Sequence, residues 1–415
     1  MRVGLLAPAD HSRVGGGINY EIETFDALLR HAKNSSHEFV LFSTDEASLP
    51  TAAREFEQVA IRWPVARQVL ARIVRIMNTF LTRGIGVPHI FLPEDWLDSL
   101  LLKKRIGLFV NLNPSTPTTA VPYSTIVWDL QHRFNPFFPE VSAKGRWTLC
   151  EDRFSRLLKR AAIVVVGNNC GLEQAERCYG VHPSRMRKLP HPTPAFALEA
   201  AQHGKLAPPP GLPAKYLFYP AQFWPHKNHV TLLRAMHYLR TEHAYCPPAV
   251  FSGSDQGNLA YVKRVAAELD LADHIHFLGF VPQAEVATLY QNAMALVYVS
   301  LCGPENLPPL EAFALGCPVI CNRHEGALEQ LGDAALFFEP LDEKSLADAI
   351  HAIYTQPALR DDLVRKGRLR ASKYTGDEFA HDMLDIIDRF SSWRACWSED
   401  GDYVPRFTWR RFLNG

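Results

Sequence analysis

A short apolar segment, residues 303–320, contains an acidic residue that could bind hydroxyl groups. Pro308 and Pro309 favour the first turn of a helix, because the amide proton that proline lacks would have no partner there anyway. The free amides of a helix start attract an anion. Glu311, which we place in the first turn, could accept hydrogen bonds from a ribose diol, or it could only stabilise the helix dipole. The segment predicts an anion site beside a hydroxyl-binding carboxylate.

A lysine in the segment 219–229 could supply the matching positive charge. Lys227 lies where a strand pattern changes into a helical one, and a lysine at such a turn offers a diphosphate a point charge beside free amides. An isolated lysine is otherwise most often a solvated surface group. His226 and His229 flank it without a third metal ligand, so we interpret them as turn and helix-cap residues. We expect Lys227 to bind phosphate.

Three glycines, Gly15, Gly16 and Gly17, follow the first apolar run and precede a helical pattern. Backbone without side chains lets a ligand approach closely. A glycine run is equally common in flexible turns, so this loop indicates a ligand only in combination with the two segments above.

The elements that must position these residues alternate between short strands and longer helices. Such alternation predicts an α/β fold with parallel sheets. In the first half we expect strands at 3–7, 39–42, 106–112, 125–128 and 163–167, and helices at 18–31, 65–82, 142–161 and 171–178. In the second half we expect strands at 216–219, 249–252, 275–278, 295–299, 319–321 and 336–338, and helices at 230–240, 259–269, 283–292, 309–315 and 346–354.

The length of the chain and its prolines predict two domains. The 415 residues exceed one compact core, and the proline-rich stretch 196–213 cannot join a sheet. We therefore expect a first α/β domain at 1–195, a linker at 196–213, a second α/β domain at 214–375, and a last helix and tail at 376–415. A ligand should bind where the carboxyl ends of both sheets face the cleft between them.

Composition narrows the partners and the compartment. Lys and Arg together number 44, as do Asp and Glu, so no overall field would recruit nucleic acid. The eight cysteines contain no Cys-x-x-Cys pair, which is typical of free thiols in a reducing compartment. The first apolar run is too short for a signal peptide, and no run approaches the ~20 residues that cross a bilayer. We expect a cytoplasmic protein that could lie on the inner face of a membrane.

The segment 303–320 resembles the signature of the retaining glycosyltransferases of family 4, also called glycosyltransferase group 1. Leu307-Pro308, Glu311-Ala312 and the run Gly-Cys-Pro-Val at 316–319 match that signature, whereas Gly303 stands where the family has a first Glu. The resemblance implies the GT-B fold, in which two Rossmann-like domains face each other and a C-terminal helix crosses back to the first. Residues 1–195 would then form the acceptor-side domain, and residues 214–375 would form the domain that binds the nucleotide-sugar donor. It also implies that Glu311 binds the donor ribose and that Glu305 replaces the missing Glu in contacting the donor sugar.

The resemblance extends to the lysine segment and the end of the strand at 125–128. Lys227 matches the family's phosphate-binding Lys, whereas Gln222 stands where the family has Arg, so that another residue, such as Arg323, would have to supply that charge. Trp128 stands where many relatives have a His near the reacting sugar. Asp129 or His132 would then face a donor or acceptor hydroxyl. Alternatively, Asp129 caps a turn and His132 packs on Phe134.

Loops that resemble the family's donor site complete the set of binding residues. The Gly253 turn and the 279–281 loop, which would hold the nucleobase, could equally be ordinary strand-end turns. The donor-binding residues that the resemblance implies are Gly15, Gly16, Gly17, Gln222, Lys227, Asn228, Gly253, Phe280, Val281, Glu305, Asn306, Leu307 and Glu311.

The resemblance implies a hexosyltransferase that acts with retention of anomeric configuration, without a metal or a cofactor. An Asp-x-Asp spacing, which metal-dependent transferases of another fold use, occurs only at Asp400 and Asp402, beyond the last predicted helix. The run Gly-Pro-Glu-Asn at 303–306 resembles mannosyltransferases of surface polysaccharide biosynthesis. We therefore expect mannose, from a GDP- or UDP-linked donor with GDP-mannose first, to pass to a glycan or a lipid-linked oligosaccharide.

Two alternatives come from other functional classes. A non-catalytic GT-B relative could act as a binding or scaffold subunit, because the first Glu and the Arg are absent. An NAD-dependent oxidoreductase could use the strand at 3–7, the glycine run and Asp45 or Glu46, but Gly-x-Gly-x-x-Gly is absent.

The predicted helix from Val65 to Thr82 could bind a membrane peripherally. Arg67, Arg72 and Arg75 would share one face, and apolar residues would fill the other, as in an interfacial helix. The alternative is that the apolar face packs on the first sheet and the arginines are merely solvated.

Overall fold

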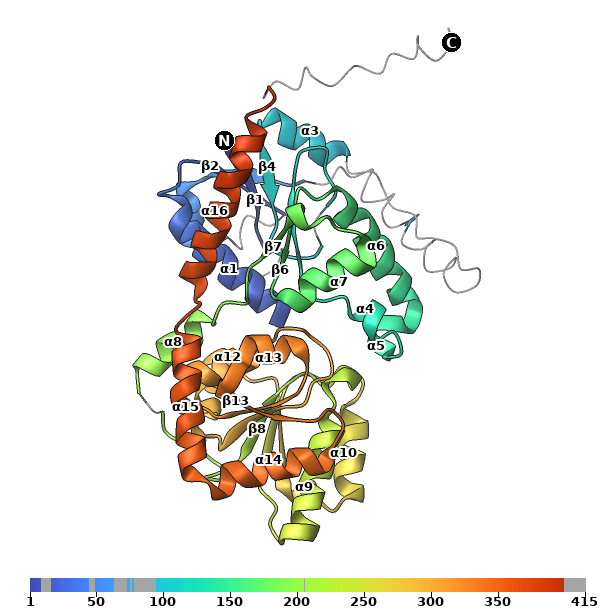
Figure 1. Ribbon diagram of the computed structural model, residues 1–415, viewed down its shortest axis with the longest axis vertical. Helices are drawn as coiled ribbons and strands as arrows, with labels where there is room; N and C mark the ends of the chain where they lie inside the picture. The colour runs from blue at the N-terminus through green and yellow to red at the C-terminus, as the bar shows by residue number, and fades with distance from the viewer. Residues whose placement is uncertain are drawn as a thin grey trace.

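The computed structural model describes residues 1–8, 16–44, 49–62, 73–74, 77, 95–115, 117–204 and 206–398. They form two α/β halves stacked end to end (Figure 1). The first half holds strands β1 to β7, and the second holds β8 to β13. None of the helices in the described part of the chain is long and apolar enough to cross a membrane.

The first half is built on parallel strands, and the residues of the inner strands are mostly apolar and buried, because helices cover both faces of the sheet. The strands pair in the order β3-β2-β1-β4 and β5-β6-β7, and Phe109 and Tyr123 bridge the two groups. The strands are β1 (Arg2–Leu6), β2 (Glu38–Ser43), β3 (Glu57–Ala60), β4 (Leu108–Val110), β5 (Ser124–Val127), β6 (Ile163–Val166) and β7 (Met186–Lys188).

Helices of the first half lie on both faces of this sheet. They are α1 (Gly16–Ala32), η2 (Thr51–Glu55), α3 (Asp95–Lys103), α4 (Gln131–Phe134), α5 (Pro139–Ser142), η3 (Ala143–Gly145), α6 (Arg146–Arg160), α7 (Asn169–Tyr179) and η4 (Pro183–Arg185). Asn168 caps α7 by accepting from the amide of Gly171 at 2.8 Å, and Gly180 ends it in the left-handed conformation.

The second half contains a six-stranded parallel sheet in the order β10-β9-β8-β11-β12-β13. The strands are β8 (Leu217–Pro220), β9 (Ala249–Ser252), β10 (Ile275–Gly279), β11 (Ala295–Tyr298), β12 (Val319–Asn322) and β13 (Ala335–Phe338). The order reverses between β8 and β11, and a doubly wound sheet binds its ligand at that switch point, beyond the carboxyl ends of the strands.

The helices of the second half enclose a single large apolar core with this sheet. They are η5 (Pro225–Lys227), α9 (His229–His243), α10 (Leu259–Glu268), η6 (Ala272–His274), α11 (Gln283–Asn292), α12 (Leu307–Ala314), α13 (Glu325–Leu331), η7 (Gly332–Ala334), α14 (Glu343–Thr355) and α15 (Pro357–Ala371).

The last helix, α16 (Gly376–Arg394), crosses back to the first half and lies along α1, as predicted (Figure 1). Thr375 and Glu378 form a capping box at its start. Phe379, Met383 and Ile387 are buried in the core of the first half, against residues of α1. The second half of the chain therefore contributes directly to the core of the first.

Most predicted elements are present, and the differences have local causes. The predicted helix 142–161 begins only at Arg146, because Lys144 and Gly145 have positive φ angles of 56° and 74°. β3 and β7 were not predicted, since both are short edge strands with charged residues. Within the stretch 196–213, the prolines flank a helix, α8 (Ala195–Gln202).

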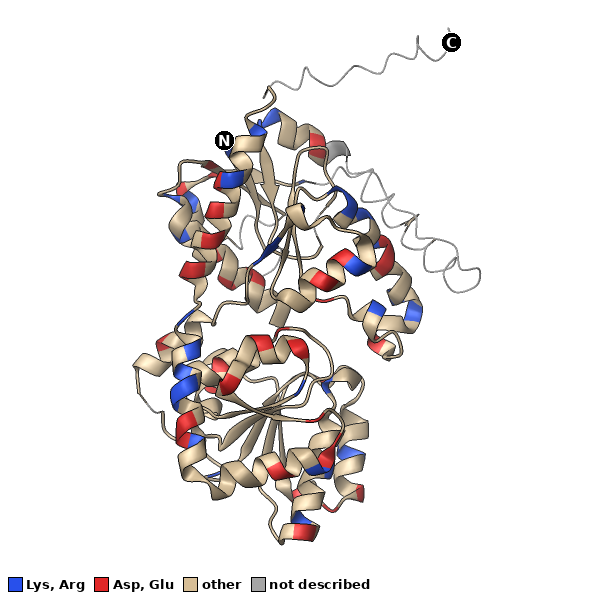
Figure 2. Ribbon diagram, in the orientation of Figure 1, with Lys and Arg blue, Asp and Glu red and all other residues tan. Residues whose placement is uncertain are grey.

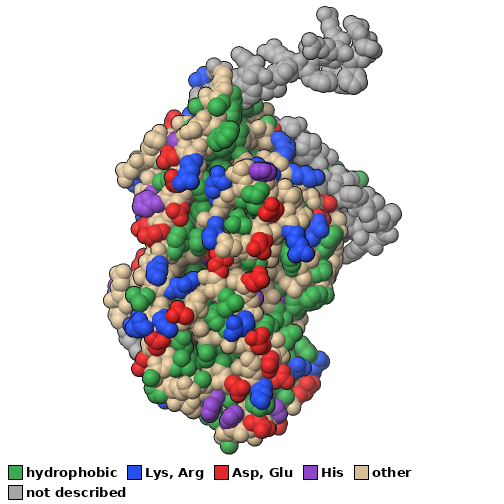
Figure 3. Space-filling view, in the orientation of Figure 1, with side chains coloured by type: hydrophobic (Ala, Val, Ile, Leu, Met, Phe, Trp, Pro, Cys, Tyr) green, Lys and Arg blue, Asp and Glu red, His purple; other side chains and the backbone are tan. Residues whose placement is uncertain are grey.

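Several predicted features lie outside the described residues. They are Gly15, Asp45, Glu46, Asp400, Asp402 and all of the predicted membrane helix 65–82 except residues 73, 74 and 77. Over the rest, basic and acidic side chains are distributed across both halves, and Figure 3 shows them intermixed with apolar ones on one face (Figures 2 and 3). All eight cysteines are free.

Candidate functional site

The turn that carries Lys227 lies at the switch point of the second sheet. It follows β8 as the 3-10 turn η5, and Asn228, with φ of 54°, turns the chain into α9. The Lys227 Nζ donates to the Tyr298 hydroxyl at 3.1 Å and to Ser300 Oγ at 3.4 Å. No ion pair joins Lys227 to a carboxylate of the described residues. A half-buried ammonium that bonds only neutral hydroxyls is suited to an incoming anion.

Tyr298 and Ser300, which sequence reasoning missed, connect this turn to the segment 303–307. Tyr298 is the last residue of β11, the strand next to β8, and Ser300 lies just beyond it. The Tyr298 hydroxyl donates to Asn306 Oδ1 at 2.7 Å, and Asn306 Nδ2 donates to the Gly303 carbonyl at 3.0 Å. The sequence could have indicated both residues. They are polar and two positions apart at the end of a strand pattern, and such residues lie on the same side of a sheet.

Glu311 lies deeper than predicted. α12 begins at Leu307, so Glu311 is in the second turn of the helix, not in the first. Its Oε2 accepts from the Tyr290 hydroxyl at 2.8 Å. Burial raises the pKa of this carboxyl to about 7, although the Tyr290 hydrogen bond opposes that shift. The group therefore titrates near neutral pH.

Glu305 faces the first half of the molecule, not a free surface beside Lys227. Its Oε1 accepts from the His191 amide at 3.2 Å, and its Oε2 lies 2.8 Å from His191 Nδ1. A Cβ at Gly167 would lie 1.2 Å from Oε2, so the absent side chain makes room for the carboxylate. The resemblance implied that Glu305 contacts the donor sugar. In the structure both of its carboxylate oxygens instead contact His191, at the junction of the two halves.

The side chains of Asp129 and His132 have different surroundings, although the two residues are only three positions apart in the sequence. Asp129 is half-buried, and its Oδ1 accepts from the Gln131 amide at 3.0 Å. Burial raises its pKa, and the charges of His132 and Lys227 oppose that shift. Asp129 therefore lies within electrostatic range of Lys227, from the opposite half of the molecule.

His132 points into the first half instead of toward Lys227. Its Nε2 lies 2.8 Å from the Tyr179 hydroxyl, and its ring stacks on Phe154 at a centroid distance of 5.4 Å. Phe134, on which His132 would pack in the alternative interpretation, is exposed. Burial lowers the pKa of His132. The side chain is 3% exposed, so it is a buried structural group and not a residue facing a substrate.

Trp128 packs against the glycine loop. A Cβ at Gly17 would lie 2.5 Å from the indole ring, whereas a Cβ at Gly16 would meet nothing within 4 Å. Tyr20 contacts the same indole edge to face at 5.9 Å. The indole nitrogen is buried and has no hydrogen-bond partner. Of the two glycines of this loop that the structure describes, Gly17 has a neighbour close to its backbone, and that neighbour is the Trp128 indole.

Gln222 contacts the Gly253 turn, one of the two loops that resemble the family's donor site. Gln222 Nε2 donates to Ser254 Oγ at 3.2 Å, and Gln222 Oε1 accepts from the Trp224 indole at 3.0 Å. Gly253 has a φ of 148°, and a Cβ there would lie 2.4 Å from the Ala221 carbonyl oxygen, so no side chain fits. Phe280 is 58% exposed after β10, and Val281 is partly buried.

Two other predictions for charged residues near the turn differ from the structure. Arg323 donates to Glu339 at 2.9 Å, so its guanidinium is paired with a carboxylate. His229 is not a cap: it is the first residue of α9, and its buried ring stacks on Phe223 at 4.5 Å. Leu307 is buried with the core of the first half, and Asn228 Oδ1 accepts from Thr231 Oγ1 at 3.0 Å.

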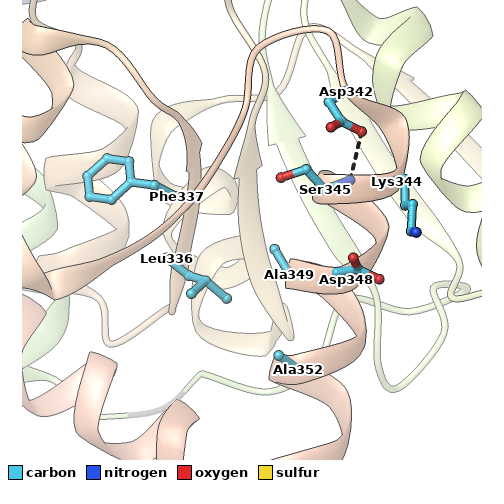
Figure 4. Close-up of a pocket in the computed structure, with 8 residues that line it drawn as sticks. All are labelled: Leu336, Phe337, Asp342, Lys344, Ser345, Asp348, Ala349 and Ala352. Atoms are coloured by element: carbon cyan, nitrogen blue, oxygen red, sulfur yellow. Dashed lines mark hydrogen bonds between the residues drawn. The ribbon is translucent and has the colours of Figure 1, made fainter.

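A separate hollow of ≈ 400 Å³ lies between β13 and α14 (Figure 4). Leu336, Ala349 and Ala352 supply its apolar wall. Asp342, which also lines the hollow, is the N-cap of α14 and accepts from the Ser345 amide at 2.9 Å. The polar groups there serve helix capping, so we assign the hollow no ligand. Among the described residues no group of three or more His, Cys, Asp or Glu could hold a metal ion.

Most of the second half of the chain matches a known protein family. Residues 208–370 match the family "Glycosyl transferases group 1". These residues form a glycosyl transferase group 1 domain. They include the Lys227 turn, the segment 303–307 and Glu311. The match disfavours the oxidoreductase alternative for this chain.

Curated relatives resemble the chain over a limited length. The O-antigen chain mannosyltransferase B of Escherichia coli is 34% identical over 155 residues, which are 36% of this chain and 38% of that protein. The O-antigen chain mannosyltransferase RfbU of Salmonella typhimurium is 38% identical over 96 residues, 23% of this chain and 27% of that protein. The matched stretches cover 38% and 27% of the length of these two relatives, so the chain spans well under two thirds of either.

Solved structures resemble the chain over almost its whole length. A sucrose-phosphate synthase from Thermosynechococcus elongatus has a TM-score of 0.69 at 18% identity, covering 94% of this chain and 99% of that one. A glycosyltransferase from Rickettsia africae has a TM-score of 0.64 at 14% identity, covering 94% and 98%. At these identities the likeness establishes the fold, which is GT-B with two parallel sheets, as predicted.

Proposed function

We propose that this protein is a hexosyltransferase that moves a hexose from a nucleoside diphosphate sugar to a glycan or a lipid-linked oligosaccharide. Mannose from GDP-mannose is our first candidate for the donor. The O-antigen mannosyltransferases that the chain resembles over part of its length support this choice. No cofactor and no metal would be required, and the configuration of the transferred sugar would be retained.

The observation that carries the proposal is the environment of Lys227. Its ammonium lies at the switch point of a group 1 domain and bonds two neutral hydroxyls, those of Tyr298 and Ser300. Breaking the anomeric C–O bond leaves negative charge on the departing diphosphate. Lys227 and the nearby amides would stabilise that charge electrostatically, in a half-buried site where such stabilisation is strong.

Four further residues would complete the donor site. Glu311 would accept hydrogen bonds from the ribose hydroxyls, and Phe280 and Val281 would flank the base. Asp129, which approaches from the first half, would bind a hydroxyl of the sugar or of the acceptor. His132 and Glu305 form contacts within the protein, with Tyr179 and His191, and the proposed donor site does not depend on either of them.

Substitution of Lys227 tests the assignment. Lys227→Ala should lower kcat severely and weaken nucleoside diphosphate binding by about 1.5–3 kcal/mol, the range for a lost hydrogen bond to a charged group. Titration calorimetry with GDP and UDP measures the binding. Lys344→Ala, on the exposed start of α14, is the matched control and should bind like the wild type. Wild-type affinity and turnover in Lys227→Ala would show that the phosphate assignment is wrong.

A non-catalytic binding subunit remains the alternative to an enzyme. Such a protein would bind the nucleotide through the same turn and would consume no donor. Incubation with GDP-mannose and UDP-hexoses, with and without acceptor glycans, distinguishes the two. Release of nucleoside diphosphate by the wild type and not by Lys227→Ala supports the enzyme.

A further inference from the structure

Glu140 reaches from the first half of the molecule to the turn that carries Lys227. Its Oε1 accepts from the backbone amide of His226 at 2.9 Å and lies 2.5 Å from His226 Nδ1. The side chain is 6% exposed, and its Oε2 is buried without a hydrogen-bond partner. A buried carboxylate from one half thus binds the turn of the other half.

Neighbouring residues of the same segment hold this contact in place. The Arg146 guanidinium donates to the Glu140 carbonyl at 3.0 Å and lies 5.9 Å from the centre of the Trp224 ring. The ring of Phe138 meets that of His226 nearly edge to face at 6.2 Å. Residues 138–146 therefore dock on the turn 224–227 as a unit, with Glu140 at its centre.

The amide that Glu140 binds is the one that the turn leaves available to an anion. The amide of Lys227 donates to the Trp224 carbonyl at 3.1 Å, and that of Asn228 donates to the Pro225 carbonyl at 3.0 Å. Both are therefore used within the turn. The amide of His226 donates instead to the carboxylate of Glu140. A negatively charged oxygen already occupies the anion position of the turn.

The negative charge of Glu140 is not cancelled by its partner. Burial, and next the charge of Lys227, lower the pKa of His226, although the carboxylate of Glu140 opposes that shift, so the site favours a neutral ring that donates a hydrogen bond. Glu140 and Lys227 also act in opposite directions on the pKa of the same thiol, that of Cys302, which places both charges in one environment. A diphosphate bound at Lys227 would meet the Glu140 charge at short range.

We propose that Glu140 is an internal anion that competes with the nucleoside diphosphate for the His226 amide. The proposal rests on the function proposed above and adds a control on the affinity of that site. The ligand must displace the carboxylate when it binds. When the diphosphate product leaves, Glu140 returns to the amide and the two halves regain this contact.

The test compares the affinity of the full chain for GDP and UDP in the wild type, Glu140→Gln and Glu140→Ala, by titration calorimetry at low salt. Both variants should bind the diphosphates about fivefold more tightly than the wild type, because the competing charge is absent. Raising the ionic strength should reduce the difference. Glu242→Gln, with the same change of charge in the exposed last turn of α9, is the control and should leave the affinity unchanged.

Equal or weaker binding by both variants would overturn the proposal, since Glu140 would then only organise the turn. Thermal melting shows whether the variants are folded; should one variant be unfolded, the other decides. If neither the wild type nor the variants bind a nucleoside diphosphate, the proposed function fails and this inference fails with it. Binding by the variants alone would support the competition.

Discussion

Lys227 and Glu305 were both assigned roles from sequence motifs, but their side chains have different surroundings in the fold. Lys227 lies at the switch point with its ammonium bonded only to hydroxyls. Glu305 lies two residues from the position that the signature reserves for an acid, yet its carboxylate binds His191 and fits the space above Gly167. A motif places the backbone of a residue, whereas the neighbouring segments decide where its side chain points.

At the residue scale, Glu311 should make nucleotide binding depend on pH. Its pKa is raised to about 7 by burial, so in the free protein it is protonated below and ionised above that value. Accepting two ribose hydroxyls requires the ionised form. Affinity for a ribose nucleotide should therefore fall as the pH drops from 8 to 6.

The control for this prediction is a nucleotide with 2′,3′-dideoxyribose, whose phosphates titrate in the same way. Its affinity should change less between pH 8 and pH 6, and Glu311→Gln should abolish the extra change for the ribose form. Calorimetry at the two pH values measures both. The same pH dependence for the two nucleotides would rule out a contact between Glu311 and the ribose.

The raised pKa also affects stability, and its sign follows from linkage. The unfolded chain releases the Glu311 proton near the ordinary value of 4.5, and the folded protein releases it near 7. Between these values the folded state binds more protons, so this group's contribution to the free energy of unfolding falls as the pH rises through the window. Burial gives Glu23 of α1 a pKa of about 7 as well, with the same sign.

At the scale of elements, the contact between the loop after β6 and the segment 303–307 should depend on a missing side chain. Gly167→Ala would place a Cβ 1.2 Å from the Glu305 carboxylate, and the carboxylate would have to leave His191. We expect a loss of about 1–3 kcal/mol in the free energy of unfolding, the usual cost of overpacking.

Gly16→Ala is the matched control, because a Cβ there meets nothing within 4 Å. Urea unfolding of both variants measures the difference. The expectation for Gly167→Ala would be contradicted by a midpoint equal to those of Gly16→Ala and the wild type. Adding Glu305→Ala to Gly167→Ala should remove much of the clash, which separates the proposed contact from a general effect on the loop.

The elements themselves could be predicted largely from the sequence, and the contacts between distant ones could not. The apolar runs at β1, β8 and β11 gave clear strand patterns, since parallel strands are buried on both faces. β3 and β7 were missed because their edge positions tolerate Glu, Gln, Arg and Lys. His132 was expected beside the substrate, but its hydrogen bond joins it to Tyr179, which is 47 residues distant in the chain. No local pattern encodes such a pairing.

At the scale of the whole molecule, the two halves are joined by contacts that span long stretches of sequence. α16 packs on α1, Glu140 binds His226, and Glu305 binds His191. The crossover of the last helix was predicted, because the resemblance to the family implied it. The sequence did not predict Glu140, since nothing in its surroundings in the sequence differs from an ordinary surface turn.

A prediction at this scale concerns association with membranes. The predicted helix 65–82 lies almost wholly outside the described residues, and its basic face in the sequence suits a surface of anionic lipid. Flotation with anionic vesicles should carry the wild type with the lipid at low salt. The Arg67/Arg72/Arg75→Glu variant and purely zwitterionic vesicles should give no flotation. Failure of the wild type to float with anionic lipid would remove the membrane proposal.

The most direct test of the central claim is proton NMR of the wild type with GDP-mannose, UDP-hexoses and acceptor glycans in the presence of EDTA. We expect one donor to be consumed, its nucleoside diphosphate to be released, and the new glycosidic bond to have the anomeric configuration of the donor. An inverted product, or activity that returns only when Mn²⁺ is added, would contradict the proposed mechanism. Consumption of no donor under any of these conditions, by a protein that is folded, would contradict the assignment of this protein as a hexosyltransferase.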